Sequence, residues 1–182
     1  MLATGSVPIK PKWLTGVDKD NVFTIPKDKV YLAGMKEKLS SCKKVVVIGA
    51  GFIGVEFSDE LAKRGHEVTL VEKLPEILSL AFDEELSKRI QALLEARGVR
   101  VVTGNGIREI LGGKKVDSVM LENGEVIETD AVILSVGYKP NVELARRSGI
   151  YVDESGFIAV DEYMRTHVRD IFAVGDCAQK RD

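Results

Sequence analysis

The sequence has little of what secreted scaffolds, membrane proteins and nucleic-acid binders require. Only two of its 182 residues are cysteines, which excludes a fold held together by several disulfides. No apolar run approaches the roughly 18 residues of a membrane-spanning helix. The 26 lysines and arginines do not outnumber the 28 aspartates and glutamates, unlike in most nucleic-acid binders. The first residues also lack a secretory signal. We therefore expect a cytoplasmic protein with neither nucleic-acid nor membrane partners.

Histidine is equally scarce, which bears on metal binding and redox chemistry. His66 and His167 have no second histidine or cysteine at metal-ligand spacing, so we expect solvated loop residues and no metal site. Cys42 and Cys177 form neither a C-x-x-C nor a C-x-x-x-x-C arrangement. Both are expected to be inert, packed thiols.

Strand and helix patterns alternate through the middle of the chain. Lys44–Gly49 (KVVVIG) is apolar throughout and predicts a strand buried on both faces of a parallel sheet. A helix over Gly54–Arg64 and a strand over His66–Glu72 follow, and then a helix over Asp83–Arg97 and a strand over Val99–Thr103. This order predicts the α/β class, with a Rossmann-like, doubly wound parallel sheet.

The next crossover is predicted to be a three-stranded antiparallel β-meander instead of a helix. Short alternating segments lie at Gly106–Leu111, Val116–Glu122 and Glu125–Thr129. Asn123-Gly124, between the last two, is a strong hairpin signal. Ala131–Val136 then returns to the composition of a buried parallel strand.

The two ends of the chain differ from this middle. Residues 1–29 are expected to be loop-like, because prolines and glycines interrupt every pattern there. A short helix is expected around Tyr31–Leu39. The segment after Gly156 is expected to form a separate tail of short strands, ending in Asp170–Gly175.

Gly49-Ala50-Gly51-Phe52-Ile53-Gly54 is a G-x-G-x-x-G sequence that leaves a predicted strand and opens a helix. The first glycine allows a tight turn, the second lets backbone approach a pyrophosphate, and the third lets the helix pack on the strand. Backbone N–H groups at the helix start would face the negative charge. Gly49, Gly51, Phe52, Ile53 and Gly54 are thus predicted to bind a dinucleotide cofactor.

Glu72 closes the second predicted strand, where a carboxylate accepts both ribose hydroxyls of an adenosine. A carboxylate repels a 2′-phosphate, so NAD(H) is predicted in preference to NADP(H). Lys73 keeps NADP(H) open, because its ammonium could pair with that phosphate. The alternative interpretation is a tight strand–helix turn beside a solvated glutamate.

Four segments resemble the pyridine nucleotide–disulfide oxidoreductase family. They are similar to its A-T-G segment, its NAD(P)H-binding fingerprint, its G-x-x-P-N loop and its G-D motif, and lie at Leu2–Pro8, Gly51–Phe57, Val136–Asn141 and Thr166–Asp176. Their order matches across essentially the whole chain. Glu72–Pro75 and Phe82–Glu85 look closest to the branch of NADH oxidase and coenzyme A-disulfide reductase.

The resemblance implies the NAD(H)-binding middle of an FAD-dependent NADH oxidoreductase, in which NADH gives a hydride to FAD. Residues 30–155 would be the NAD(H)-binding domain, residues 1–29 a remnant of the FAD domain with a linker, and residues 156–182 the returning FAD-domain segment. The family's FAD fingerprint, redox cysteine and interface domain do not occur in the sequence. We therefore expect this chain to bind NADH, hold FAD poorly and oxidise little NADH by itself. The missing FAD and interface domains are expected partners, and the full-length protein is expected to be a homodimer.

The resemblance also assigns roles to individual residues. Glu56 would meet the nicotinamide carboxamide and pair with a lysine of the flavin domain, although a glutamate in a first helix turn also favours the helix dipole without any ligand. Val136 and Gly137 would lie at the nicotinamide end. Ala3-Thr4-Gly5 would lie near FAD, and Asp176 would accept a hydrogen bond from its ribityl chain.

Two other functions are alternatives to this interpretation. A stand-alone NADH-binding or sensor module without chemistry has no reason to keep Ala3-Thr4-Gly5 and Gly175-Asp176. A short-chain dehydrogenase needs a lysine four residues after a tyrosine. The four tyrosines are instead followed at that spacing by Met35, Val142, Ser155 and His167, which excludes that class.

Overall fold

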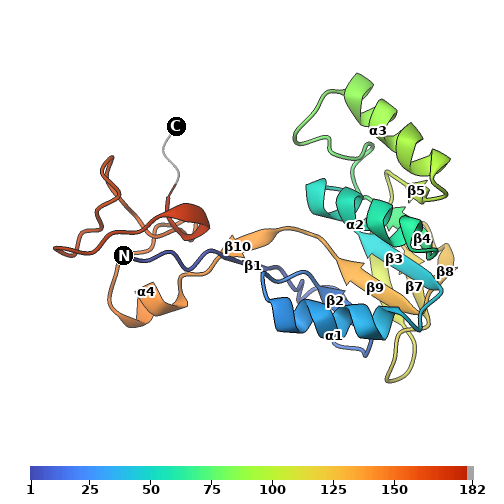
Figure 1. The fold of residues 1–182 in the computed structure, drawn as a ribbon, viewed down its shortest axis with the longest axis horizontal. Helices are drawn as coiled ribbons and strands as arrows, with labels where there is room; N and C mark the ends of the chain where they lie inside the picture. The colour runs from blue at the N-terminus through green and yellow to red at the C-terminus, as the bar shows by residue number, and fades with distance from the viewer. Residues whose placement is uncertain (180–182) are drawn as a thin grey trace. The chain divides into compact units, whose positions relative to one another are not determined.

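The computed structural model describes residues 1–179 and divides the chain into two compact units (Figure 1). Ile9–Gly137 forms the larger unit, and Met1–Pro8 together with the chain from Tyr138 onward forms the smaller one. These boundaries differ from the predicted domain edges at 29/30 and 155/156. Much of the predicted N-terminal loop belongs to the larger unit, because it supplies a strand to the central sheet.

Five parallel strands form that sheet, in the order β2-β9-β3-β4-β5. Their bounds are Val22–Thr24 for β2, Lys44–Ile48 for β3, Glu67–Val71 for β4, Arg100–Val102 for β5 and Ala131–Leu134 for β9. Val46 of β3 pairs with Thr69 on one side and Val132 on the other. The sequence predicted four of these strands and missed β2.

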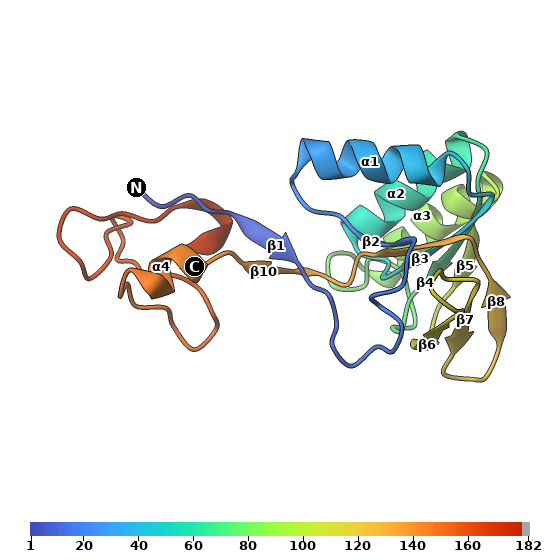
Figure 2. The ribbon, with the colours of Figure 1, turned by 90° about the horizontal axis from the view of Figure 1, so that it is seen from below.

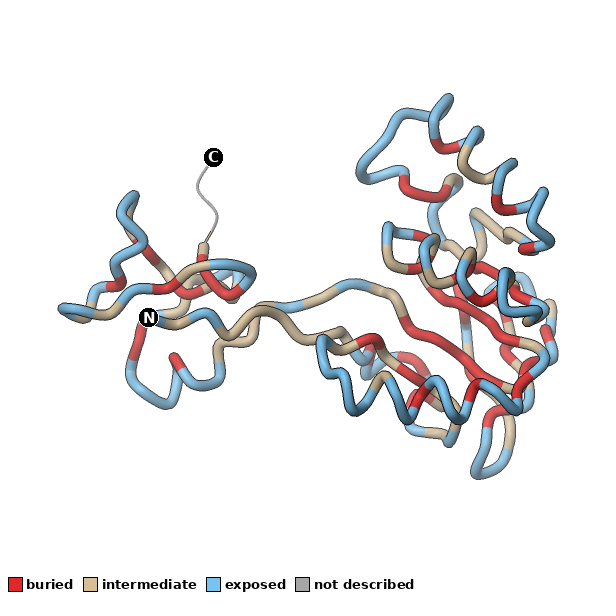
Figure 3. Tube along the Cα trace, viewed as in Figure 1, coloured by how far each residue is buried: buried red, intermediate tan, exposed pale blue. Residues whose placement is uncertain are grey.

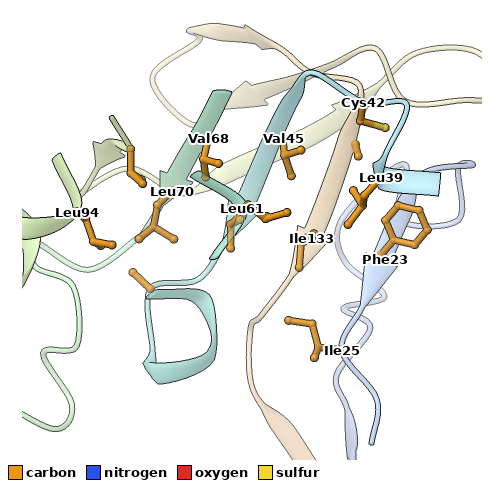
Figure 4. Packing of buried hydrophobic residues seen from close by; sticks show 14 of the residues in the cluster. Phe23, Ile25, Leu39, Cys42, Val45, Leu61, Val68, Leu70, Leu94 and Ile133 are labelled. Carbon is orange, nitrogen blue, oxygen red and sulfur yellow. The ribbon is translucent and has the colours of Figure 1, made fainter. Parts of the chain in front are cut away.

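Three helices cover one face of the sheet: α1 (Lys29–Leu39), α2 (Phe52–Lys63) and α3 (Glu84–Ala96). Val45 and Val47 point to this helical side, whereas Val46 and Ile48 belong to the core on the opposite side. Figure 4 shows the helical side, where Leu61 and Leu94 reach the sheet from α2 and α3. The sheet strands carry a dense run of buried residues (Figure 3).

The other face is covered by an antiparallel meander of β6 (Ile107–Leu111), β7 (Ser118–Leu121) and β8 (Val126–Glu128). Figure 2 shows the meander and the helices on opposite sides of the sheet. Val119 and Leu121 have no exposed surface. The predicted fold class is confirmed: both faces of a Rossmann-like sheet are covered, one of them by the β-meander.

The helices of the larger unit begin in two different ways. The Asp28 carboxylate accepts hydrogen bonds from the N–H groups of Val30 and Tyr31 at the start of α1, at 2.9 and 3.1 Å. Asp83 caps α3 in the same manner, accepting from Leu86 N–H at 2.9 Å. By contrast, α2 begins after Gly51 with no side-chain cap.

The smaller unit is built around a strand pair from distant parts of the chain. β1 (Ser6–Pro8) runs antiparallel to β10 (Tyr138–Pro140), and α4 (Glu143–Arg147) and a 3₁₀ turn at Gly175–Cys177 complete its regular structure. The sequence predicted neither this strand pair nor α4. The expected tail of short strands forms only single bridges, for example between Leu2 and Ala173. Lys180, Arg181 and Asp182, the end of the predicted returning segment, lie outside the described residues.

Within residues 1–179, no helix combines the length and apolar character needed to cross a membrane. Over the same residues, no three histidine, cysteine or acidic side chains gather as metal ligands would.

Candidate functional site

The loop between β3 and α2 is shaped by two glycines that tolerate no side chain. Gly49 has φ +95°, and a Cβ atom there would lie 2.7 Å from the carbonyl oxygen of Ser135. A Cβ atom on Gly54 would lie 1.9 Å from the carbonyl oxygen of Gly49. Strand and helix therefore approach so closely that only hydrogen fits at both positions.

Gly51 differs from these two glycines. Its φ is −72°, which any residue adopts, and a Cβ atom there would meet no atom within 4 Å. The protein itself therefore does not require glycine at this position. The open space lies beside the N-terminus of α2, where no side chain accepts from the helix N–H groups. This arrangement suits an external anion.

Ser135, which the sequence analysis did not single out, fixes this loop from the neighbouring strand. It directly follows β9, and its hydroxyl lies 3.0 Å from the carbonyl oxygen of Ile48 and 2.5 Å from that of Gly49. A serine after an apolar strand is too common to be a signal, so only the pairing of β9 with β3 reveals it.

Glu72 is held by backbone on both of its carboxylate oxygens. Oε2 accepts a 2.7 Å hydrogen bond from Ala50 N–H, and Oε1 accepts a 2.9 Å bond from Leu74 N–H. The carboxylate therefore lies against the glycine loop. The alternative interpretation of a solvated glutamate required it to extend into solvent. Each oxygen keeps acceptor capacity for a further donor.

A cavity of about 160 Å³ lies between these strand ends and the meander. Four of the predicted site residues line it: Gly49, Glu72, Lys73 and Val136. It is smaller than the roughly 300 Å³ or more of typical pockets for drug-sized ligands, so it can take one part of a dinucleotide and not the whole. Its lining also includes residues that the sequence did not indicate, namely Trp13, Leu14, Ile48, Val71, Gly106, Ile107 and Glu122.

The remaining predicted residues of the larger unit lie outside this cavity lining. Phe52 is 61% exposed, and its ring is nearly perpendicular to that of Phe82, with the two centroids 5.6 Å apart. Ile53 packs on the helical-side core. Glu56 is exposed and lines the grooves on both sides of α2. Gly137 has φ +102° and lies beside Ile9.

The four predicted FAD-contacting residues all belong to the smaller unit. The segment Ala3-Thr4-Gly5 is bonded to Asn141, whose N–H donates to the Gly5 carbonyl oxygen at 2.9 Å and whose own carbonyl oxygen accepts from the Thr4 hydroxyl at 2.5 Å. Ser6 Oγ donates to Asp176 Oδ2 at 2.9 Å. The structure thus brings the A-T-G segment and the G-D motif together.

Both cysteines are free, buried thiols, as expected. Burial raises the pKa of the Cys42 thiol, which disfavours the reactive thiolate. Of the two histidines, His167 is exposed as predicted. His66 is only half-exposed, and its Nδ1 lies 3.0 Å from the carbonyl oxygen of Cys42, so the prediction of a solvated residue is wrong there.

Comparison with known proteins gives a consistent result over the whole chain. Residues 1–182 match the family described as pyridine nucleotide-disulphide oxidoreductase. An NADH oxidase of Methanocaldococcus jannaschii is 37% identical over 185 residues, which cover 100% of this chain and 40% of the relative.

Two solved structures are also similar. The NAD-dependent persulfide reductase from A. fulgidus is 34% identical with a TM-score of 0.88, over 97% of this chain and 32% of that one. The water-forming NADH oxidase from Lactobacillus brevis, bound to NADH, is 30% identical with a TM-score of 0.86, over 97% and 38%. This chain therefore spans less than half the length of each of these relatives.

Proposed function

The chain belongs to the pyridine nucleotide-disulphide oxidoreductase family, and on that premise we propose that its larger unit binds NADH. In the whole protein, an FAD-dependent NADH oxidoreductase of the NADH oxidase or disulfide reductase type, this unit would present NADH to FAD. The bound nicotinamide would supply a hydride, and FAD would accept it.

The proposal rests on the N-termini of the three helices, because the start of α2 at Gly51 differs from the capped starts of α1 and α3. Aspartates satisfy the first N–H groups of α1 and α3, but α2 starts at an open glycine without a cap. A pyrophosphate can approach backbone at Gly51 and accept from the N–H groups at the start of α2, where the helix dipole also favours negative charge. A helix start of this kind fits a dinucleotide better than a purely structural turn.

Glu72 supports the choice of NADH. Its two backbone hydrogen bonds hold the carboxylate at the rim of the cavity, where it can accept from ribose hydroxyls. A 2′-phosphate at the same place would meet a fixed negative charge. Val136 lines the same cavity.

We assign Glu56 and Gly137 to the nicotinamide end of the cofactor. Glu56 lies on the first turns of α2, exposed and therefore accessible to a carboxamide group. Gly137 has no side chain to keep a cofactor away from its backbone, and it adopts a positive φ of +102°. In the whole protein, Ala3-Thr4-Gly5 and Asp176 would contribute to the FAD site.

This chain by itself should bind NADH in the micromolar range, bind FAD poorly and oxidise little NADH. The test titrates NADH, ADP-ribose and FAD into the 182-residue chain by calorimetry. Gly51→Ala should weaken NADH and ADP-ribose at least about tenfold, because the added methyl group occupies the space that the pyrophosphate needs.

Gly34→Ala is the matched control. Gly34 lies in α1, is exposed, and a Cβ atom there also meets no atom within 4 Å. That variant should bind NADH as the unchanged protein does. Equal binding by the Gly51→Ala chain would contradict the proposal, and tight stoichiometric FAD in the purified chain would contradict its incomplete flavin site.

A further inference from the structure

Lys73, which the sequence offered as a partner for a 2′-phosphate, already has a partner. Its Nζ lies 3.3 Å from Oε1 of Glu122, a residue that follows β7 in the meander. Both side chains line the same cavity as Glu72. The rim of the cavity therefore carries two carboxylates and one ammonium group, and that ammonium is already paired with one of the carboxylates.

The position of Glu122 is set by its surroundings. Its N–H donates a 2.9 Å hydrogen bond to the carbonyl oxygen of Gly106, a buried residue. A Cβ atom on Gly106 would lie 2.9 Å from Glu122 Oε1, so the absence of a side chain at Gly106 makes room for this carboxylate. The next residue, Asn123, donates its N–H to the side chain of Asn105 at 3.3 Å.

We infer that Glu122 is a specificity-determining residue that makes this site prefer NADH to NADPH. The inference rests on the proposed function, because it assumes that the cavity receives the adenosine ribose of the cofactor. Glu122 acts in two ways. It forms an ion pair with the ammonium of Lys73, and it adds a second negative charge beside Glu72.

The chemistry of the two cofactors differs only at the ribose 2′ position. The 2′-phosphate of NADPH carries between one and two negative charges near pH 7 and would be repelled by both carboxylates. The 2′-hydroxyl of NADH is neutral and can donate to a carboxylate. The net charge of one negative unit at the rim therefore penalises the extra phosphate of NADPH, which NADH lacks.

The expected change in NADPH affinity follows from how far the side chains of this ion pair are exposed to solvent. The side chains of Lys73 and Glu122 are 74% and 49% exposed, so water and salt screen their charges. A single screened surface pair contributes little, but Glu122 acts through both a pairing and a repulsion. Removing its charge should therefore improve NADPH affinity by about tenfold, and by more at low salt.

The experiment measures the dissociation constants of NADH and NADPH for the full chain by calorimetry at low and moderate salt. Glu122→Gln keeps the size of the side chain and removes its charge. We expect NADPH to bind about tenfold more tightly and NADH to change less than about twofold. Adding Lys73→Met to Glu122→Gln should abolish most of the gain. Lys73→Met alone should weaken NADPH further, because both carboxylates at the rim then lack a positive partner.

Glu125→Gln is the matched control on the same turn. Its carboxylate pairs with Arg100 at 2.6 Å, and Glu125 does not line the cavity. The control should leave the ratio of the two dissociation constants unchanged. Equal melting temperatures for all variants would show that the changes concern binding.

The inference would be overturned if the ratio of the two dissociation constants stayed unchanged in Glu122→Gln, or changed equally in Glu125→Gln. NADH binding by the unchanged chain would still support the proposed function in that case. If neither nucleotide binds to any of these proteins, the proposed function and the inference fail together.

Discussion

A Cβ atom on Gly54 would lie 1.9 Å from the carbonyl oxygen of Gly49, so the first and last glycines of the loop contact each other across the start of α2. Gly51 lies between them and has open space instead. The G-x-G-x-x-G sequence thus combines two glycines required by the fold with one glycine that the fold leaves free.

Gly54→Ala is expected to destabilise the protein. The added methyl group collides with backbone, which cannot move aside as a flexible side chain can, so α2 must shift away from β3. The free energy of unfolding should fall by about 2 kcal/mol or more, measured by urea denaturation. Gly51→Ala should lose no more than about 1 kcal/mol, the value of a poorer helix cap. Similar losses for the two variants would contradict this division of roles.

Ser135→Ala tests how the loop is fixed. The variant loses the hydroxyl group that lies within hydrogen-bond distance of the Ile48 and Gly49 carbonyls. We expect a loss of about 1 kcal/mol in the free energy of unfolding and a several-fold weaker affinity for NADH, followed by calorimetry. Ser118→Ala, which removes a hydroxyl that donates to the neighbouring Asp117 carboxylate, serves as the control. Unchanged NADH affinity in Ser135→Ala would mean that the loop is held without this contact.

Glu72→Ala should weaken NADH far more than NADPH, because only NADH gains from a carboxylate at the ribose. The same variant also removes acceptors from Ala50 N–H and Leu74 N–H, so some stability is lost with it. Glu72→Gln keeps an amide oxygen for one of these donors and separates the two effects. Fluorescence titration with both cofactors provides the comparison, and an equal loss for NADH and NADPH would refute the role at the ribose.

Asp130→Asn should change how stability depends on pH. The N–H groups of Lys44 and Lys43 donate to the Asp130 carboxylate at 2.8 and 2.7 Å, and these bonds lower its pKa. A lowered carboxylate pKa stabilises the folded protein above the unfolded value of about 3.9, and this contribution disappears as pH falls through the folded value. The stability difference between the unchanged protein and Asp130→Asn should therefore be constant above about pH 5 and shrink below about pH 4.

Denaturation curves from pH 2.5 to 7 would measure this dependence. Glu128→Gln is a suitable control, because its carboxylate is largely exposed and pairs with the Lys44 ammonium. Such an exposed pair is screened by water and salt and should contribute little to stability at any pH in this range. A difference for Asp130→Asn that stays constant down to pH 2.5 would contradict the prediction.

The sequence predicted those parts of the fold that are encoded by short, local sequence patterns. The buried run of β3, the glycine loop and the Asn123-Gly124 turn each contain their own structural signal within a few residues. The strands that were missed lack such a signal. β2 has three residues, and its partner β9 follows more than a hundred residues later. Short segments of this kind become strands only because the sheet edge is already present.

The same distinction applies to the candidate site. Gly49, Gly51, Gly54 and Glu72 could be named from spacing, because one βαβ unit positions all of them. Ser135 and Glu122 come from β9 and from the meander, whose placement over the strand ends depends on the packing of both faces. A glutamate before an Asn-Gly turn is ordinarily a solvated residue, so nothing local indicated the ion pair with Lys73.

The strand pair β1–β10 has one more consequence. Pro8 and Tyr138 are partners in its register, and the larger unit is the stretch of chain between them. The backbone thus departs from the smaller unit and rejoins it at neighbouring points. A segment with adjacent ends can be exchanged or excised without pulling its host apart, as in successful domain insertions. A tight hairpin linker could replace residues 9–137, and the excised segment could be grafted into another host that offers two adjacent strand ends.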